Sequence, residues 1–127
     1  MIVKNWRNSK PVMEPTIHGA GIDWRVFSRC ELNSLDSSAC LKKLGFFAFA
    51  MLQPSGSYQP HGHDHEEIYY IIKGKGIIKG IKENNITEDF NIRSGDVVIT
   101  PVGEKHQIIN NGCETIEFIA WCADERY

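Results

Sequence analysis

The chain has 127 residues, of which 42% are hydrophobic, a length and composition that suit one domain around one continuous core. Its formal charge of −2, with lysines and arginines scattered along the chain, argues against nucleic acid or an anionic membrane as a partner. Charged residues and prolines interrupt the N-terminal segment, so we expect neither a signal peptide nor a spanning helix and predict a cytoplasmic protein.

The cysteines indicate thiols rather than a disulfide framework. There are four of them, Cys30, Cys40, Cys113 and Cys122, and no two form a Cys-x-x-Cys pair. Because a reduced cysteine behaves as a small hydrophobic residue, we predict that these thiols are buried.

The first third of the chain is expected to be an accessory part of a single domain. We predict that residues 1–43 form strands or an arm that packs on a barrel of residues 44–127, with residues 21–29, "GIDWRVFSR", as an extra strand. Residues 34–45, "SLDSSACLKKLG", are predicted to form a single short helix or turn, since leucines share one face and Gly45 follows the last turn.

From Leu44 onward, short apolar runs alternate with turn residues. "ENN" at 83–85 suits a hairpin tip, "RSGD" at 93–96 suits a turn, and Pro101 ends the run "VVIT". Short, evenly spaced strands of this kind predict an all-β sandwich or barrel.

A histidine cluster, "HGHDHEE" at 61–67, directly precedes one of these strands. In an extended chain His61 and His63 point to the same side, at a spacing that lets two imidazoles share a metal ion. We expect His65 and Glu66 to face away, with His65 in an exposed turn. Glu67 is predicted to be a third ligand, because it starts an apolar strand where a buried carboxylate is costly unless it is paired or bound to a cation.

A second segment, Gly95 to Asn110, adds His106 on a neighbouring predicted strand. Its spacing is Gly, five residues, Pro, one residue, Gly, two residues, His, three residues and Asn, which Gly95, Pro101, Gly103, His106 and Asn110 satisfy. This is the second motif of the cupin superfamily, and the sequence therefore resembles a cupin. The resemblance implies a single-domain jelly-roll β-barrel of the RmlC-like kind, with at most one short helix.

The first cupin motif is also present. His61, His63, Glu67 and Gly74 match it, whereas four residues, instead of the expected five, separate Gly56 from His61. That departure shifts a loop and leaves the ligands in place. The resemblance implies that His61, His63, Glu67 and His106 bind one divalent transition metal ion, either Fe, Mn, Ni, Zn, Co or Cu, which this ligand set does not distinguish.

Four ligands leave two positions of an octahedral ion open, as in catalytic rather than closed structural sites. The resemblance therefore favours a metal-dependent enzyme acting on a small molecule, of the dioxygenase, isomerase, lyase or decarboxylase type. The alternative is a module that binds or senses a sugar or carboxylate without catalysis. Because the chain has no DNA-binding segment, a stand-alone enzyme is the favoured interpretation. Small cupins also imply a homodimer.

Other residues are weaker candidates for the site. Tyr69 shares the predicted inward face with Glu67 and is a candidate catalytic acid, although a core phenol with a bonded hydroxyl is the alternative. Phe47, Phe49 and Met51 alternate along one predicted strand and are candidates to line an apolar pocket. We expect Asn110 to cap a turn and His18 to be a surface residue near a turn.

Overall fold

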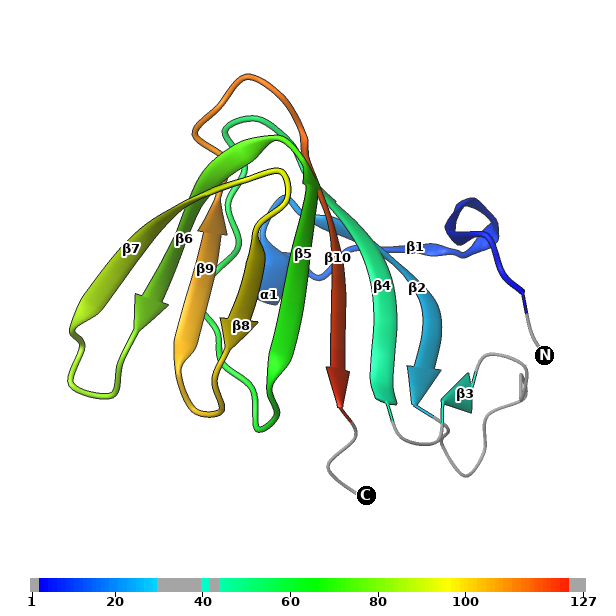
Figure 1. The fold of residues 1–127 in the computed structure, drawn as a ribbon, viewed down its shortest axis with the longest axis horizontal. Helices are drawn as coiled ribbons and strands as arrows, with labels where there is room; N and C mark the ends of the chain where they lie inside the picture. The colour runs from blue at the N-terminus through cyan, green and yellow to red at the C-terminus, as the bar shows by residue number, and fades with distance from the viewer. Residues whose placement is uncertain (1–2, 30–39, 42–43, 124–127) are drawn as a thin grey trace.

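The computed structural model describes residues 3–29, 40–41 and 44–123, which form two facing β-sheets (Figure 1). The strands are β1 (Pro11–Val12), β2 (Ile22–Arg29), β3 (Cys40–Leu41), β4 (Leu44–Leu52), β5 (Glu67–Lys73), β6 (Lys75–Ile81), β7 (Thr87–Arg93), β8 (Val97–Thr100), β9 (Lys105–Ile109) and β10 (Ile116–Ala123). A 3₁₀ turn, η1 (Trp6–Asn8), and a single-turn helix, α1 (Pro15–His18), precede β2.

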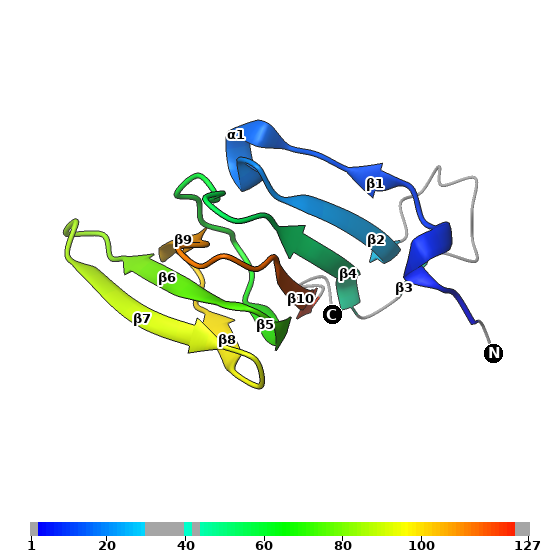
Figure 2. The same cartoon turned by 90° about the horizontal axis from the view of Figure 1, so that it is seen from above.

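The two sheets differ in size. The larger has seven strands in the order β1-β2-β4-β10-β5-β8, with β3 added beside β2, and the smaller has three in the order β7-β6-β9. All pairs are antiparallel except β2 with β3. Figure 2 shows the small sheet lying across one end of the large one. This is the all-β jelly roll that the sequence predicts.

Strict alternation of side chains builds the core between the sheets. Along β10, the inward residues Ile116, Phe118, Ala120 and Cys122 are buried, and the intervening residues are partly exposed. Along β5 the buried positions are Glu67, Tyr69 and Ile71, as predicted. A carboxylate and a phenol thus stand in the same row as a core isoleucine. That row places polar groups at the inner surface.

The turns between strands follow the predicted chemistry. Strands β6 and β7 form a hairpin whose tip contains Asn85, at a φ of 61°, in the left-handed region that asparagine tolerates. Gly95, in the predicted "RSGD" turn, has a φ of 93° and joins β7 to β8. Both predicted turns are therefore confirmed.

The N-terminal part extends the large sheet through β2, which pairs with β4 along most of its length, so the extra strand predicted at residues 21–29 is confirmed. On the outer face, the Trp6 ring stacks on Phe49 with centroids 4.2 Å apart and meets the edge of Trp24 at 5.0 Å.

The prediction of a helix at 34–45 is wrong where it can be checked. Residues 40–41 pair with β2 and residues 44–45 begin β4, and the others of that range lie outside the described residues.

The cysteines partly follow the prediction. Cys122 is buried, but Cys113 is exposed because it lies in the turn between β9 and β10. Cys30 and the side chain of Cys40 lie outside the described part of the chain. In that part, no helix is long and apolar enough to cross a membrane.

Candidate metal centre

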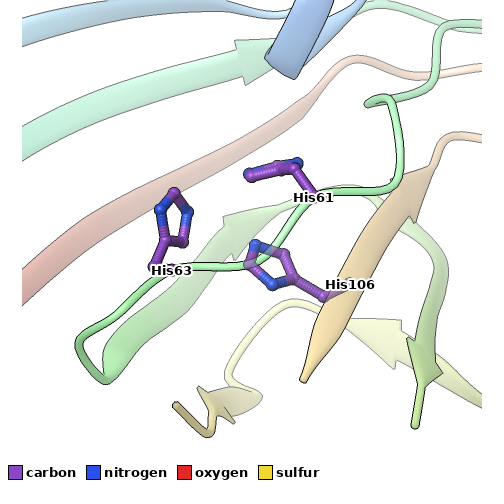
Figure 3. A group of neighbouring side chains, drawn as sticks. All are labelled: His61, His63 and His106. Carbon is purple, nitrogen blue, oxygen red and sulfur yellow. The ribbon is translucent and has the colours of Figure 1, made fainter. Parts of the chain in front are cut away.

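Three imidazoles converge from two separate segments of the chain. His61 and His63 lie between β4 and β5, and His106 lies on β9 of the small sheet (Figure 3). One ligand atom from each lies within 4.8 Å of the others. Two backbone hydrogen bonds hold the segments together, from the His61 amide to the His106 carbonyl (3.1 Å) and from the His106 amide to the His61 carbonyl (2.8 Å). The predicted meeting of these histidines is thus observed.

The His61 ring is oriented by its own loop. Its Nδ1 lies 2.7 Å from the carbonyl oxygen of Gln59, which can only accept, so Nδ1 carries the proton and donates. The other nitrogen, Nε2, then holds a lone pair, and it is buried with no hydrogen-bond partner among the described residues. A histidine that donates through one nitrogen and presents the other is typical of metal ligands.

Glu67 lies beside two of the histidines and is 4% exposed. Its Oε1 is 3.3 Å from Nε2 of His63, and its Oε2 is 3.7 Å from Nε2 of His106. Burial alone would raise the pKa of Glu67, but interaction with His63, a hydrogen bond from Tyr69 and the charge of His106 outweigh it and lower the pKa to about 2. The carboxyl group is therefore ionised at neutral pH.

Tyr69 holds Glu67 in place from within the core. Its hydroxyl donates to Oε2 of Glu67 at 2.8 Å and lies 3.0 Å from Nε2 of His106. Complete burial, followed by the charge of Glu67, raises the pKa of Tyr69 well above its usual value. The phenol remains protonated, and its one proton is directed at Glu67.

Two of the three imidazoles, His61 and His106, have a lowered pKa. Burial lowers the pKa of His106 to about 3, and the neighbouring His61 acts in the same direction. Burial also lowers the pKa of His61. Neutral imidazole and ionised carboxylate are the forms in which these side chains bind metals.

A second group of possible ligands overlaps the first. His63, His65 and Glu67 also bring ligand atoms within 4.8 Å of one another, and Nε2 of His65 is 3.6 Å from Oε1 of Glu67. The expectation that His65 faces away is therefore wrong, since its side chain is only 20% exposed. The bend at Asp64 and His65 turns the His65 ring back toward Glu67. The two-residue spacing of the three histidines is the sequence signal that could have indicated this orientation.

A cavity of about 670 Å³ adjoins these residues. One wall is made by the small inward side chains of Ala48 and Ala50 on β4 and Ala120 on β10, which leave space between the sheets. Larger apolar groups, Phe46 and Phe118, also line it.

The three candidate pocket residues of β4, for which core packing was the alternative, do not line the cavity. The inward residues of β4 are Phe46, Ala48 and Ala50, so Phe47, Phe49 and Met51 alternate to the outer face. The sequence pattern located the strand and its alternation but did not indicate which set of alternating residues faces inward.

By contrast, Asn110 has the expected role: it is buried, donates to the carbonyls of Leu52 and Glu114, and accepts from the Gly112 amide.

The cavity lining also contains polar residues from the N-terminal part of the chain, which the sequence did not indicate. They are Glu14, His18, Asp23 and Arg25, which come from α1, its N-cap and β2. His18 was expected on the surface, but it lines the cavity with a side chain 17% exposed. The available signal was the alternation of Asp23 and Arg25 on a strand of otherwise largely apolar residues.

The fold and the site define the class of the protein. The model of the cupin domain family matches residues 48–122, and this chain belongs to the cupin family. An oxalate-binding protein from Thermotoga maritima is 38% identical over 87 residues, covering 68% of each chain.

Solved structures give the same architecture. The crystal structure of a predicted oxalate decarboxylase from Thermotoga maritima superposes with a TM-score of 0.71 at 29% identity, covering 96% of this chain and 98% of that one. The polyketide cyclase RemF from Streptomyces resistomycificus superposes with a TM-score of 0.69 at 19% identity, covering 97% and 79%. Likeness at that lower identity shows the shared fold alone.

Proposed function

We propose that this chain is a metal-dependent cupin that binds a small carboxylate, with oxalate as the first ligand to test. His61, His63, Glu67 and His106 would hold one divalent transition metal ion. The observation that carries the proposal is the convergence of three imidazoles and one ionised carboxylate beside a cavity, with the buried Nε2 of His61 left without a partner.

The spacing of the donor atoms suits a shared ion. Two ligands at about 2.1 Å from a metal lie about 3.0 Å apart when they are at right angles and about 4.2 Å apart when they are opposite. Oε1 of Glu67 lies 3.3 Å from Nε2 of His63, within this range. Without a cation, the histidine nitrogen of His61 would remain buried and unsatisfied, which costs free energy.

The oxalate suggestion rests on similarity together with chemistry. A relative that is 38% identical is named an oxalate-binding protein. A divalent ion acts as a Lewis acid and binds carboxylate oxygens at its open positions. In this chain, Tyr69 would keep Glu67 oriented, and the two-sheet cavity would limit access of water.

Catalysis is a second candidate function, favoured by similarity to a structure described as a predicted oxalate decarboxylase. Cleavage of the carbon–carbon bond of hydrogen oxalate gives one carbon dioxide and one formate, with the acid proton ending on the formate carbon. Incubation of metal-loaded protein with oxalate would then release the two products in equal amounts. Binding without either product would favour the non-catalytic module.

The ligand assignment is tested by a matched pair of variants on one loop. We expect protein purified without a chelator or histidine tag to carry up to one transition metal ion per chain by elemental analysis. His61→Ala should abolish this content, whereas His65→Ala should retain it. The reverse pattern would assign the ion to His63, His65 and Glu67, and contradict the proposed ligand set.

Carboxylate binding is measured separately by calorimetry. Oxalate should bind metal-loaded protein and should not bind protein stripped with a chelator. Equal binding by both forms would contradict a metal-dependent function.

We also propose a homodimer. Val97 and Ile99 on β8 are each 60% exposed, and they lie opposite Tyr70 and Ile68 of β5 on the outer face of the large sheet. A second copy of the chain covering this apolar surface would remove it from water. Native mass spectrometry should show a dimer, and a monomer alone would contradict the proposal.

A further inference from the structure

The N-terminal part of the cavity lining contains a buried acid with an unused oxygen. Asp23, on β2, is 6% exposed. Nε of Arg25 donates to its Oδ2 at 3.0 Å, whereas Oδ1 is buried and has no hydrogen-bond partner within the described ranges. A buried carboxylate oxygen without a donor is costly, so this atom is suited to receive a donor from a bound molecule.

His18 extends this polar site toward the proposed metal ligands. Its Nδ1 is 3.8 Å from Oδ1 of Asp23, too far for a hydrogen bond, and is likewise buried without a partner in the described part of the chain. Its ring centroid lies 4.7 Å from that of Tyr58 and 5.4 Å from that of His61. His18 therefore lies between the acid and the candidate metal centre.

The charge of this N-terminal part favours a neutral donor over a second anion. Among the described residues of this part of the lining, Arg25 is the one that is always cationic, and its guanidinium already contacts both Glu14 and Asp23. An added carboxylate would meet two acids whose one arginine is occupied. A hydroxyl group would instead donate its one proton to Oδ1 of Asp23 and could accept a hydrogen bond from His18.

We propose that Asp23 and His18 form a specificity site for the far end of the ligand held at the metal, which rests on the proposed function. The site selects a small carboxylate that carries a hydrogen-bond donor: a hydroxycarboxylate, or a dicarboxylate such as oxalate with one end protonated. Asp23 accepts from the donor, and Arg25 positions Asp23. These residues lie outside the matched cupin segment, residues 48–122.

One substitution reverses the hydrogen-bonding character of the site. In Asp23→Asn, Nε of Arg25 requires an acceptor, so the amide oxygen would take the position of Oδ2. The amide nitrogen would then replace Oδ1 and present a donor where the wild type presents an acceptor. The variant should therefore disfavour the hydroxyl that the wild type prefers.

The probes are 3-hydroxybutyrate and butyrate, which differ by one hydroxyl group, titrated into metal-loaded protein by calorimetry. The wild type should bind 3-hydroxybutyrate about tenfold more tightly, the effect of one hydrogen bond to a charged group. Asp23→Asn should lose this preference with its metal content unchanged. Asp89→Asn, on β7 of the other sheet, should retain it.

Equal binding of the two probes by the wild type, or a preference that survives in Asp23→Asn, would overturn this inference. A wild type that holds no metal or binds no carboxylate would overturn the proposed function, and this site with it. If Asp23→Asn shows no cooperative thermal unfolding, His18→Phe is used instead, since it retains ring packing against Tyr58 and removes Nδ1. The preference should then fall a few-fold, and an unchanged preference would again overturn the inference.

Discussion

Two parts of the cavity lining differ in how their buried polar groups are connected to one another. On the histidine side, Glu67, Tyr69 and His106 form a connected set with contacts of 2.8 to 3.7 Å. On the N-terminal side, Asp23 and His18 face each other at 3.8 Å with one atom of each left unsatisfied. Both sides hold buried atoms without a partner among the described residues, but only the histidine side has a hydrogen-bond network that fixes its carboxylate, as a metal site requires.

The largest expected effect is a difference in metal affinity between a variant on the histidine side and a variant on the N-terminal side. His106→Ala removes a proposed ligand and should weaken metal binding by more than about 100-fold, beyond the usual effect of losing a partner outside the ligand set. His18→Ala, on the N-terminal side of the cavity, should leave the metal affinity within about twofold of the wild-type value. Competition with a metal-binding dye measures both. Similar losses of metal affinity in the two variants would contradict the assignment of the metal ligands to the histidine side alone.

Phe118 lies on β10 against rings from both sides of the cavity, 5.2 Å from Tyr69 and 6.1 Å from Tyr58. It is 0% exposed, so Phe118→Ala should lower the free energy of unfolding by about 3–5 kcal/mol. Chemical denaturation measures the loss. Phe90→Ala, whose side chain is 51% exposed, should change it far less, and equal losses would contradict the assigned core.

Tyr69→Phe tests the preformed hydrogen bonds of the histidine side. Loss of the hydroxyl leaves Glu67 without its donor and should weaken metal binding about 10- to 100-fold while the ligands remain. Tyr70→Phe, on the outer face of the same strand, is the matched control. Unchanged affinity in Tyr69→Phe would show that the phenol does not position the carboxylate.

The smallest effect concerns the ion pairs of Arg25. Its side chain is 41% exposed, so Arg25→Gln should lower the free energy of unfolding by no more than about 1 kcal/mol. Lys79→Gln, with a more distant partner in the small sheet, should be close to neutral. A loss of several kcal/mol in Arg25→Gln would indicate that the N-terminal side is as tightly organised as the histidine side.

The sequence predicted the histidine side and missed the N-terminal side for a physical reason. His61, His63 and Glu67 lie close together in the chain, so strand periodicity and motif spacing locate them, and the motif adds His106. His18, Asp23 and Arg25 reach the cavity only because β2 pairs with β4. Such pairing joins segments that are distant in the chain. Which of the two alternating faces of a strand points inward depends on which face is buried, and the same uncertainty led to the wrong face for Phe47 and Phe49.

The paired amides and carbonyls of His61 and His106 have a mechanical consequence. His106 belongs to the small sheet and Glu67 to the large one, so an ion shared by them would clasp the two layers together. Opening of the sandwich at this edge would then require release of the ion, and metal binding would slow solvent exchange of these two amide protons. The hydrogen-exchange rates of these two amides would therefore report whether the centre holds a metal ion.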